Sequence, residues 1–354
     1  MREKLTCASF FAGVGGIDLG FESTGFFKTV YANEFDPYPV ETLKNNFSDI
    51  IIDCRDIKEV QPSDFPDVDV IMGGFPCQAF SVAGYRKGFE DEKGRGTLFF
   101  ELLRLIKAKK PQIVFLENVK NLQSHDKGNT YRVIKEALED AGYHVTEKVL
   151  NAMKHGNVPQ NRERIYIVGF LSMEAKEHFD FPEPIELTNT IKDIIDFENT
   201  VDEKYYYTEG KYKGDIYDQL KAEMNDPSTV YQWRRKYVRK NQSNVVPTLT
   251  ANMGEGGHNV PLVLTPSGIR KLTPKECFNA QGFPMGFDLP KHLNDSKLYK
   301  QAGNSVCVSV IERIAGNIFS AIEKMEICKK CNSKIVYRGE EVKYCPYCGE
   351  EFIR

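Results

Sequence analysis

No uninterrupted apolar run in this sequence approaches the length of a membrane span, and neither sign of charge predominates. Its 354 residues include 47 lysines and arginines against 50 aspartates and glutamates, a net charge of −3. A membrane span needs about 18 consecutive apolar residues, and the opening residues, MREKLTCASFF, lack the long apolar segment of a secretory signal. We therefore expect a cytoplasmic protein with no membrane partner. Any surface that binds nucleic acid has to be local, because a protein that coats DNA uniformly is basic.

Closely spaced cysteines, which could form disulfides or bind a metal together, occur only in the last part of the sequence. Five of the nine stand singly, and we expect them to be reduced thiols: Cys7, Cys54, Cys77, Cys277 and Cys307. The remaining four form two C-x2-C pairs separated by thirteen residues, namely Cys328, Cys331, Cys345 and Cys348. This spacing is typical of a four-cysteine zinc ribbon. Two disulfides are the alternative, which a reducing cytoplasm disfavours, so we predict a structural Zn²⁺ in the tail.

Short apolar runs alternate with amphipathic stretches over the first 170 residues. This alternation predicts βαβ units, and therefore an α/β domain built on a parallel sheet. The expected strands are residues 5–11, 29–33, 68–72, 112–116 and 165–170, and the expected helices are residues 98–108 and 131–141.

The composition of the sequence and its hydrophobic periodicity change near residue 181. Two prolines in FPEPIEL open a polar, tyrosine-rich stretch, which predicts a separate irregular domain over residues 182–300. Apolar residues then recur every four positions from Val310 to Ile322, which predicts a helix capped at Asn304 or Ser305 that packs back on the first domain. The predicted units are residues 1–181, 182–300, 301–325 and the cysteine-bearing tail, 326–354.

A glycine-rich turn follows the first predicted strand. It reads Ala12-Gly13-Val14-Gly15-Gly16, where the backbone can approach a ligand closely. Glu34 ends the next strand and is placed to bind the two hydroxyls of an adenosine ribose. On these residues alone, a nicotinamide dehydrogenase and an S-adenosylmethionine enzyme fit equally well.

A cysteine and a glutamate follow two further strands. Cys77 lies in GGFPCQAFS and Glu117 in FLENV, so both are expected at the carboxyl edge of the sheet, where α/β sites lie. Alone, the cysteine would be read as a small buried hydrophobe and the glutamate as a surface charge. Together they predict a nucleophile and an acid that share one site.

These two groups suit addition to a cytosine ring. Carbon 5 of cytosine becomes nucleophilic only after a thiolate adds at carbon 6, a task that fits Cys77. Glu117, kept protonated by burial, would donate a proton to ring nitrogen 3. Arg162 and Arg164, two residues apart, are expected on one face, where they hold the base carbonyl and keep the surroundings of the thiolate positive. The alternative is a surface ion pair with Glu163.

From residue 5 to about residue 320 the chain resembles the bacterial DNA (cytosine-5) methyltransferases. The resemblance rests on an ordered set of motifs: FAGVGG, ANEFD, Asp56-Ile57, FPCQAFS, GTLFF, ENV, QNRER and QAGNSV. It implies a Rossmann-like S-adenosylmethionine-dependent methyltransferase fold with a smaller irregular target-recognition domain, to which this chain adds the zinc ribbon. It assigns the base chemistry to Cys77, Glu117, Arg162 and Arg164. It assigns S-adenosylmethionine to Phe11, Val14, Glu34, Phe35, Asp56, Ile57, Pro76, Leu98, Asn304 and Val306.

Two basic segments are candidates for contact with double-stranded DNA. Residues 82–97 are rich in glycine and carry Arg95, which predicts a lid beside the nucleophile. The segment YQWRRKYVRK, residues 231–240, carries Arg234, Arg235, Lys236 and Arg239 without an acidic residue between them. A solvated basic face is the alternative, and the resemblance favours DNA for this segment and for residues 248–252. A target base inside a duplex has to be rotated out of the stack.

We therefore expect a monomeric DNA (cytosine-5) methyltransferase that modifies a short duplex sequence and protects it from a cognate restriction enzyme. An RNA cytosine methyltransferase and a non-catalytic DNA-binding relative are the alternatives. The long second domain favours DNA, and the presence of Cys77, Glu117 and both arginines favours catalysis. The sequence does not identify a partner for the zinc ribbon.

Overall fold

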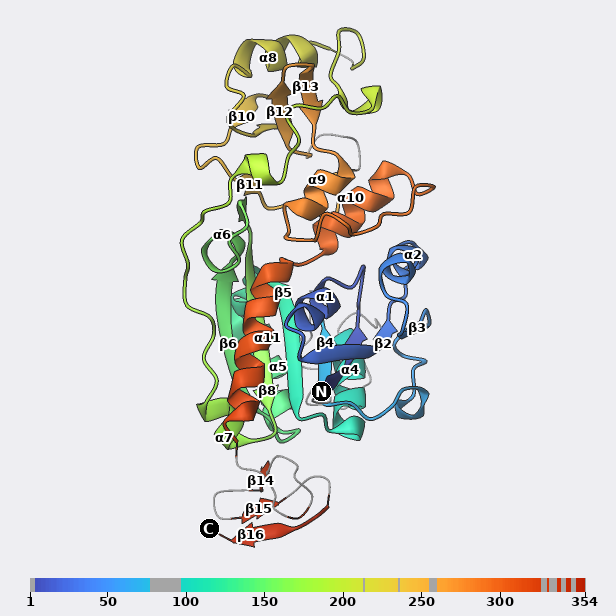
Figure 1. The fold of residues 1–354 in the computed structure, drawn as a ribbon, viewed down its shortest axis with the longest axis vertical. Coiled ribbons are helices and arrows are strands. Elements are labelled where there is room, and N and C mark those ends of the chain that lie inside the picture. The colour runs from blue at the N-terminus through green and yellow to red at the C-terminus, as the bar shows by residue number, and fades with distance from the viewer. Residues whose placement is uncertain are drawn as a thin grey trace.

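In the computed structural model the chain is elongated, with one large sheet in the middle and a smaller sheet above it (Figure 1). The structure describes residues 4–76, 97–212, 214–234, 236–254, 260–325, 330, 336–338, 342–344 and 348–353.

Seven strands form the central sheet in the order β3-β2-β1-β4-β5-β8-β6. The five strands from β3 to β5 are parallel, whereas β8 is antiparallel to both of its neighbours. The α/β class is confirmed, as are all five predicted strands. The strand bounds are β1 Leu5–Phe10, β2 Phe27–Asn33, β3 Ile51–Asp53, β4 Val70–Gly73, β5 Ile113–Val119, β6 His144–Asn151 and β8 Glu163–Phe170.

The expectation of a wholly parallel sheet is wrong at β8. Only the four-residue helix α6 (Ala152–His155) and the two-residue strand β7 (Gln160–Asn161) separate β6 from β8. A parallel connection needs a crossover of a dozen or more residues, usually a helix. The chain therefore returns antiparallel, between β5 and β6.

Helices cover both faces of the sheet and bury it (Figure 1). Alternate strand residues point to opposite faces, so Val70 and Met72 pack with one set of helices and Ile71 with the other. Helices α1 and α11 lie on the first face, and α4 and α5 on the second. The helix bounds are α1 Gly16–Ser23, α2 Pro37–Asn46, α4 Thr97–Lys109, α5 Asn129–Glu139, α7 Met173–Glu177 and α11 Val308–Glu323.

Helix α11 packs on the first domain as predicted, but the predicted cap is wrong. Asn304 is the last residue of α10 (Asp295–Asn304), and Ser305 is extended, so α11 begins only after Cys307. Its contact with α1 is close, because a Cβ on Gly20 would overlap Ile311. Within the described residues, the stretch Asp295–Glu323 is long and apolar enough to cross a membrane, yet 61% of its apolar window is buried inside the protein. It is therefore read as a core helix.

Residues 182–300 build a smaller sheet of four strands in the order β10-β9-β12-β13. The buried ion pair between Arg270 and Glu276 (2.8 Å) ties its last strand to helix α9. Strand β11 pairs with β7 in a separate two-stranded sheet and so joins this part to the connection between β6 and β8. The bounds are α8 Ile216–Glu223, β9 Tyr231–Trp233, β10 Val238–Lys240, β11 Val246–Pro247, β12 Leu262–Thr265, β13 Gly268–Lys271 and α9 Pro274–Asn279.

The tail contributes three short antiparallel strands at the opposite end of the molecule from the smaller sheet (Figure 1). Their bounds are β14 Val336–Arg338, β15 Val342–Tyr344 and β16 Glu351–Ile353. Among the described residues there is no group of three or more His, Cys, Asp or Glu side chains that could hold a metal. Cys328, Cys331 and Cys345 lie outside the described residues, so the zinc site stays a prediction.

Candidate active site

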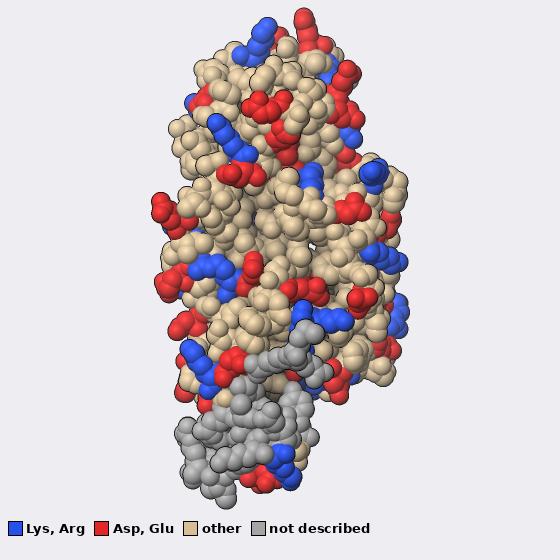
Figure 2. Space-filling view, viewed as in Figure 1, with Lys and Arg blue, Asp and Glu red and all other residues tan. Residues whose placement is uncertain are grey.

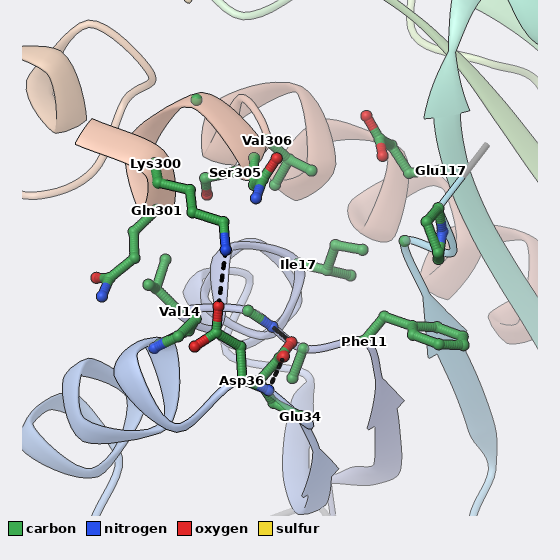
Figure 3. A pocket seen from close by; sticks show the side chains of 18 of the residues that line it. Phe11, Val14, Ile17, Glu34, Asp36, Glu117, Lys300, Gln301, Ser305 and Val306 are labelled. Atoms are coloured by element: carbon green, nitrogen blue, oxygen red, sulfur yellow. Dashed lines mark hydrogen bonds and ion pairs between the residues drawn. The ribbon is translucent and has the colours of Figure 1, made fainter. Parts of the chain in front are cut away.

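The carboxyl ends of β1, β2, β4 and β5 open into one cleft of about 720 Å³. The C-terminal half of α10 and the turn that follows it form the opposite wall. In Figure 3, Lys300, Gln301, Ser305 and Val306 come from this wall and face the β1–α1 turn, while Glu117 lies at the far end. The cleft is thus where the sequence predicted it, at the carboxyl edge of the parallel strands.

The glycine-rich turn is held in a conformation that side chains resist. Gly13 and Gly15 have φ of 56° and 82°, in the left-handed region that favours glycine. A Cβ on Gly15 would also lie 2.8 Å from the Leu43 side chain. Phe11 adopts φ 54° without that freedom, a strained backbone of the kind that clusters at functional sites.

Glu34 supports this turn from the end of β2. Its Oε2 accepts a hydrogen bond from the Gly13 amide (2.8 Å), and its Oε1 accepts one from the Asp36 amide (2.8 Å). Burial raises the pKa of the Glu34 carboxyl, while these two amide bonds oppose the shift. Each carboxylate oxygen has two acceptor sites, so Glu34 keeps acceptor capacity for a hydroxyl in the cleft.

Six of the ten predicted cofactor positions line the cleft: Phe11, Val14, Glu34, Pro76, Asn304 and Val306. The other four are not among its lining residues. Phe35 is 69% exposed, Ile57 is in the core, Leu98 packs against that core, and Asp56 accepts a hydrogen bond from the Lys58 amide (3.0 Å).

Sequence reasoning missed the contacts that close the cleft between α2 and α10. Lys300 Nζ lies 3.0 Å from Asp36 Oδ2 across the cleft (Figure 3), and Lys297 lies over the Tyr38 ring at 4.0 Å. These partners are about 260 positions apart in the sequence, and no local pattern joins them.

Glu117 lies near the carboxyl end of β5, lines the cleft and is 8% exposed. Arg164 Nε lies 3.1 Å from its Oε1. Burial still raises the pKa of Glu117, although Arg164 and Arg162 act in the opposite direction. The next residue, Asn118, donates a hydrogen bond to the Phe75 carbonyl (2.7 Å) and so joins this strand end to the segment that leads to residue 77.

Cys77 and Arg95 lie outside the described residues. Pro76, the residue before Cys77, lines the cleft together with Gly74 and Glu117.

Arg162 and Arg164 both line the cleft, but their partners differ. Arg164 pairs with Glu117, whereas Arg162 donates to the carbonyls of Leu249 (2.9 Å), Gly303 (3.2 Å) and Ser305. The alternative of an ion pair with Glu163 finds no support, since that carboxylate pairs with Lys120 at 3.0 Å.

The basic segment at residues 231–240 forms the β9–β10 hairpin. Tyr231 and Trp233 are buried in the core beneath it. Its exposed basic residues are Arg234, Lys236, Arg239 and Lys240, of which Lys240 pairs with Asp226 at 2.8 Å, and Arg235 lies outside the described residues. On the face drawn in Figure 2, blue and red side chains are interspersed, which agrees with the small net charge.

Residues 246–250 run beside the QNRER segment. β11 pairs with β7, Thr248 donates to the Asn161 carbonyl (2.6 Å), and Arg162 holds Leu249. The exposed side chains of Thr248 and Thr250 therefore lie next to the cleft.

The sequence profile of a family described as "C-5 cytosine-specific DNA methylase" matches residues 5–320. Type II methyltransferase M.Bsp6I of Bacillus sp. (strain RFL6) is 61% identical over 319 residues, which cover 90% of this chain and 99% of that protein. Type II methyltransferase M.DsaV of Dactylococcopsis salina is 37% identical over an alignment that covers 100% of this chain and 98% of that protein.

Two solved structures share the fold. The S. pombe Dnmt2 methyltransferase has a TM-score of 0.68 at 18% identity and covers 90% of this chain and 99% of its own. The Entamoeba histolytica methyltransferase EhMeth has a TM-score of 0.69 at 17% identity, with 90% and 99% coverage. At this identity the likeness concerns the fold alone.

Proposed function

The chain belongs to the C-5 cytosine-specific DNA methylase family, and from this premise we propose how its cleft residues carry out the reaction. It is a type II DNA (cytosine-5-)-methyltransferase of a restriction-modification system and uses S-adenosylmethionine. Membership of this family excludes two of the alternatives that the sequence left open, a nicotinamide dehydrogenase and a non-catalytic DNA-binding relative.

The cleft suits the methyl donor, which supplies an electrophilic methyl group. A volume of about 720 Å³, a glycine turn that allows close approach and a buried carboxylate at Glu34 match a nucleoside with an amino-acid side arm. The residues we assign to it are Phe11, Val14, Glu34, Phe35, Asp56, Ile57, Pro76, Leu98, Asn304 and Val306.

Catalysis begins with the thiolate of Cys77, which forms a bond to carbon 6 of the cytosine. The displaced electrons move through the ring, and nitrogen 3 takes a proton from Glu117, so that carbon 5 becomes an enamine carbon. Carbon 5 would then form a bond to the donated methyl group as the bond between that methyl group and the sulfonium sulfur of the donor breaks, with S-adenosylhomocysteine as the leaving group. Loss of the carbon 5 proton to a base restores the double bond and expels the thiolate, and nitrogen 3 returns its proton to Glu117.

The environment of Glu117 is the observation that most directly supports this mechanism. It is buried and lines the same cleft as Pro76, and its raised pKa favours the protonated acid that the addition requires. Arg164 orients the carboxyl through its contact at 3.1 Å. With Arg162, it keeps the site positive for the thiolate.

A fluorinated target tests this route. When fluorine replaces the hydrogen on carbon 5, elimination is blocked, so duplex DNA with 5-fluorocytosine at the target should form a denaturation-resistant complex in the presence of S-adenosylmethionine. Peptide mapping should place the cross-link on Cys77, and Cys77→Ser should form none. A wild-type enzyme that methylates normal DNA yet never traps on the fluorinated target would contradict the covalent mechanism.

DNA recognition is assigned to residues 182–300, with residues 1–181 as the catalytic unit and residues 301–325 as the helix that returns to it. The assigned DNA contacts are Arg95, Arg234, Arg235, Lys236 and Arg239, supported by the exposed hairpin and by the exposed threonines beside the cleft. We expect a cytoplasmic monomer. Mapping 5-methylcytosine at single-base resolution on a plasmid treated with purified protein will identify the target, and transfer RNA in the same assay distinguishes an RNA methyltransferase.

The tail is assigned as a zinc ribbon held by Cys328, Cys331, Cys345 and Cys348. Three supports are the C-x2-C spacing, the three short antiparallel strands and the M.DsaV alignment, which extends over the whole chain. The family profile ends at residue 320, so the tail is an addition to the catalytic unit.

A further inference from the structure

Arg162 is buried to the same degree as the hydrophobic core and makes no ion pair among the interactions of the described residues. It is 2% exposed, and both terminal nitrogens of its guanidinium donate to backbone carbonyls. Burial lowers its pKa to about 9, and the neighbouring Arg164 adds to the shift. The group therefore stays charged at neutral pH. Its two terminal nitrogens donate to the protein's own backbone, and its buried Nε has no hydrogen-bond partner among the described residues.

The carbonyls that Arg162 binds belong to two segments far apart in the chain. Leu249 follows β11, on the side assigned to DNA, whereas Gly303 and Ser305 belong to the wall of the cofactor cleft. A single planar side chain thus spans both functional surfaces. The fork of the guanidinium permits this, and an ammonium group has no equivalent geometry.

The two segments also touch directly. A Cβ on Gly303 would overlap the carbonyl of Thr250, so the backbones meet at this point without an intervening side chain. A displacement of the cofactor wall is therefore transmitted to residues 249–250, because packed backbones held by charged hydrogen bonds do not move independently.

We propose that Arg162 is a positioning residue that couples occupancy of the cofactor cleft to the placement of the DNA-facing segment 246–250, and that it does not itself contact the base. The inference rests on the proposed assignment of residues 182–300 to DNA. Coupling of this kind is reciprocal: a cofactor that strengthens DNA binding is itself bound more tightly on DNA, by the same factor.

The test measures this factor. Fluorescence anisotropy gives the Kd of a duplex carrying the mapped target, with and without saturating S-adenosylhomocysteine, and the ratio of the two values is the coupling factor. We expect a wild-type factor in the range of about 5–150 and a factor near one for Arg162→Lys. The matched control, Arg164→Lys, alters the residue that faces Glu117, so it should slow methyl transfer yet keep the wild-type factor.

A second variant alters the contact between the cofactor wall and residues 249–250 at Gly303 instead of at Arg162. Gly303→Ala pushes the Thr250 carbonyl away while leaving Arg162 intact, and it should also lower the coupling factor, even if Arg162→Lys fails to fold. A wild-type factor of one, or folded Arg162→Lys and Gly303→Ala proteins with the wild-type factor, would overturn the proposal. Because methyl transfer by the wild-type enzyme is measured separately, either result would leave the proposed function standing.

Discussion

At the scale of single residues, two carboxyls on the neighbouring strands β5 and β8 lie in opposite environments. Glu117 is buried with a raised pKa, whereas Glu163 on the neighbouring strand pairs with Lys120 in solvent. Burial favours the protonated form of Glu117, and its place in the cleft lets it give that proton to a base there.

Glu117→Gln should slow methyl transfer by a factor of about 100 or more, since an amide hydrogen-bonds nitrogen 3 but cannot protonate it. Single-turnover transfer of a tritiated methyl group to duplex DNA measures the effect. Glu163→Gln is the control, and we expect it to stay close to the wild-type rate. A near-normal rate for Glu117→Gln would remove this residue from the mechanism.

A second buried carboxyl, Asp18 in the first turn of α1, governs stability instead of chemistry. Its Oδ2 accepts a hydrogen bond from the Ser9 hydroxyl (3.0 Å), and burial raises its pKa to about 7 from an ordinary value of 3.8. The folded protein thus keeps a proton that the unfolded chain releases, so stability falls as the pH rises from about 4 through 7.

Urea unfolding of wild type and Asp18→Asn should expose this dependence. Because one pKa unit corresponds to about 1.4 kcal/mol, the wild type should lose roughly 2 kcal/mol relative to Asp18→Asn between about pH 5.5 and pH 8. Titrations common to both proteins cancel in the difference. Parallel stability profiles would show that Asp18 is charged in the folded state throughout.

At the scale of elements, the β9–β10 hairpin separates a buried aromatic face from an exposed basic one. Tyr231 and Trp233 anchor it in the core, and this anchoring leaves Arg234, Lys236 and Arg239 in solvent. The hairpin therefore presents cations on a fixed scaffold, as contact with a phosphate backbone or a base edge requires.

Arg234→Ala should weaken DNA binding and reduce the slope of log affinity against log salt by about one, as expected for one lost phosphate contact. If the residue reads a base, the sequence requirement should relax at one position by about 1–3 kcal/mol. Lys221→Ala, on the exposed side of α8, is the control. Unchanged affinity, salt slope and specificity would contradict a DNA contact and favour the alternative that the hairpin is a solvated basic face.

The sequence predicted those elements whose signals are local. The five apolar strands were found because burial on both faces makes them continuous hydrophobic runs, whereas edge strand β6 was missed because its polar and apolar residues mix. The antiparallel course of β8 and the start of α11 depend on connection length and tertiary packing. In the cleft, motifs identified Glu34 and Glu117, but Lys300 and Asp36 meet only after folding.

At the scale of the whole molecule, the central sheet separates the smaller sheet from the tail (Figure 1). The tail strands lie at the end remote from the cleft and follow the last turn of α11. A change in the tail should therefore leave the chemistry intact.

Protein made in zinc-containing medium should hold one zinc per chain, measured by elemental analysis of the full-length protein. A chain ending at Lys324 should lose the metal and keep methyltransferase activity, because the cleft residues all precede that point. Replacing Cys328 and Cys331 with serine in the full chain is the matched control. Zinc content near zero in the wild type would refute the ribbon.

Helix α11 has a consequence for how this protein is made. It covers the face of the sheet that β1 and α1 leave apolar, yet it is synthesised long after both of them. At about 5–20 residues per second, the apolar face of the nascent sheet stays uncovered for tens of seconds before α11 is made. During this time Phe21 and Phe115 are exposed to chaperones. Newly translated enzyme thus becomes active only after residues 308–323 have been made, and a ribosome that stalls before residue 308 releases no functional fragment.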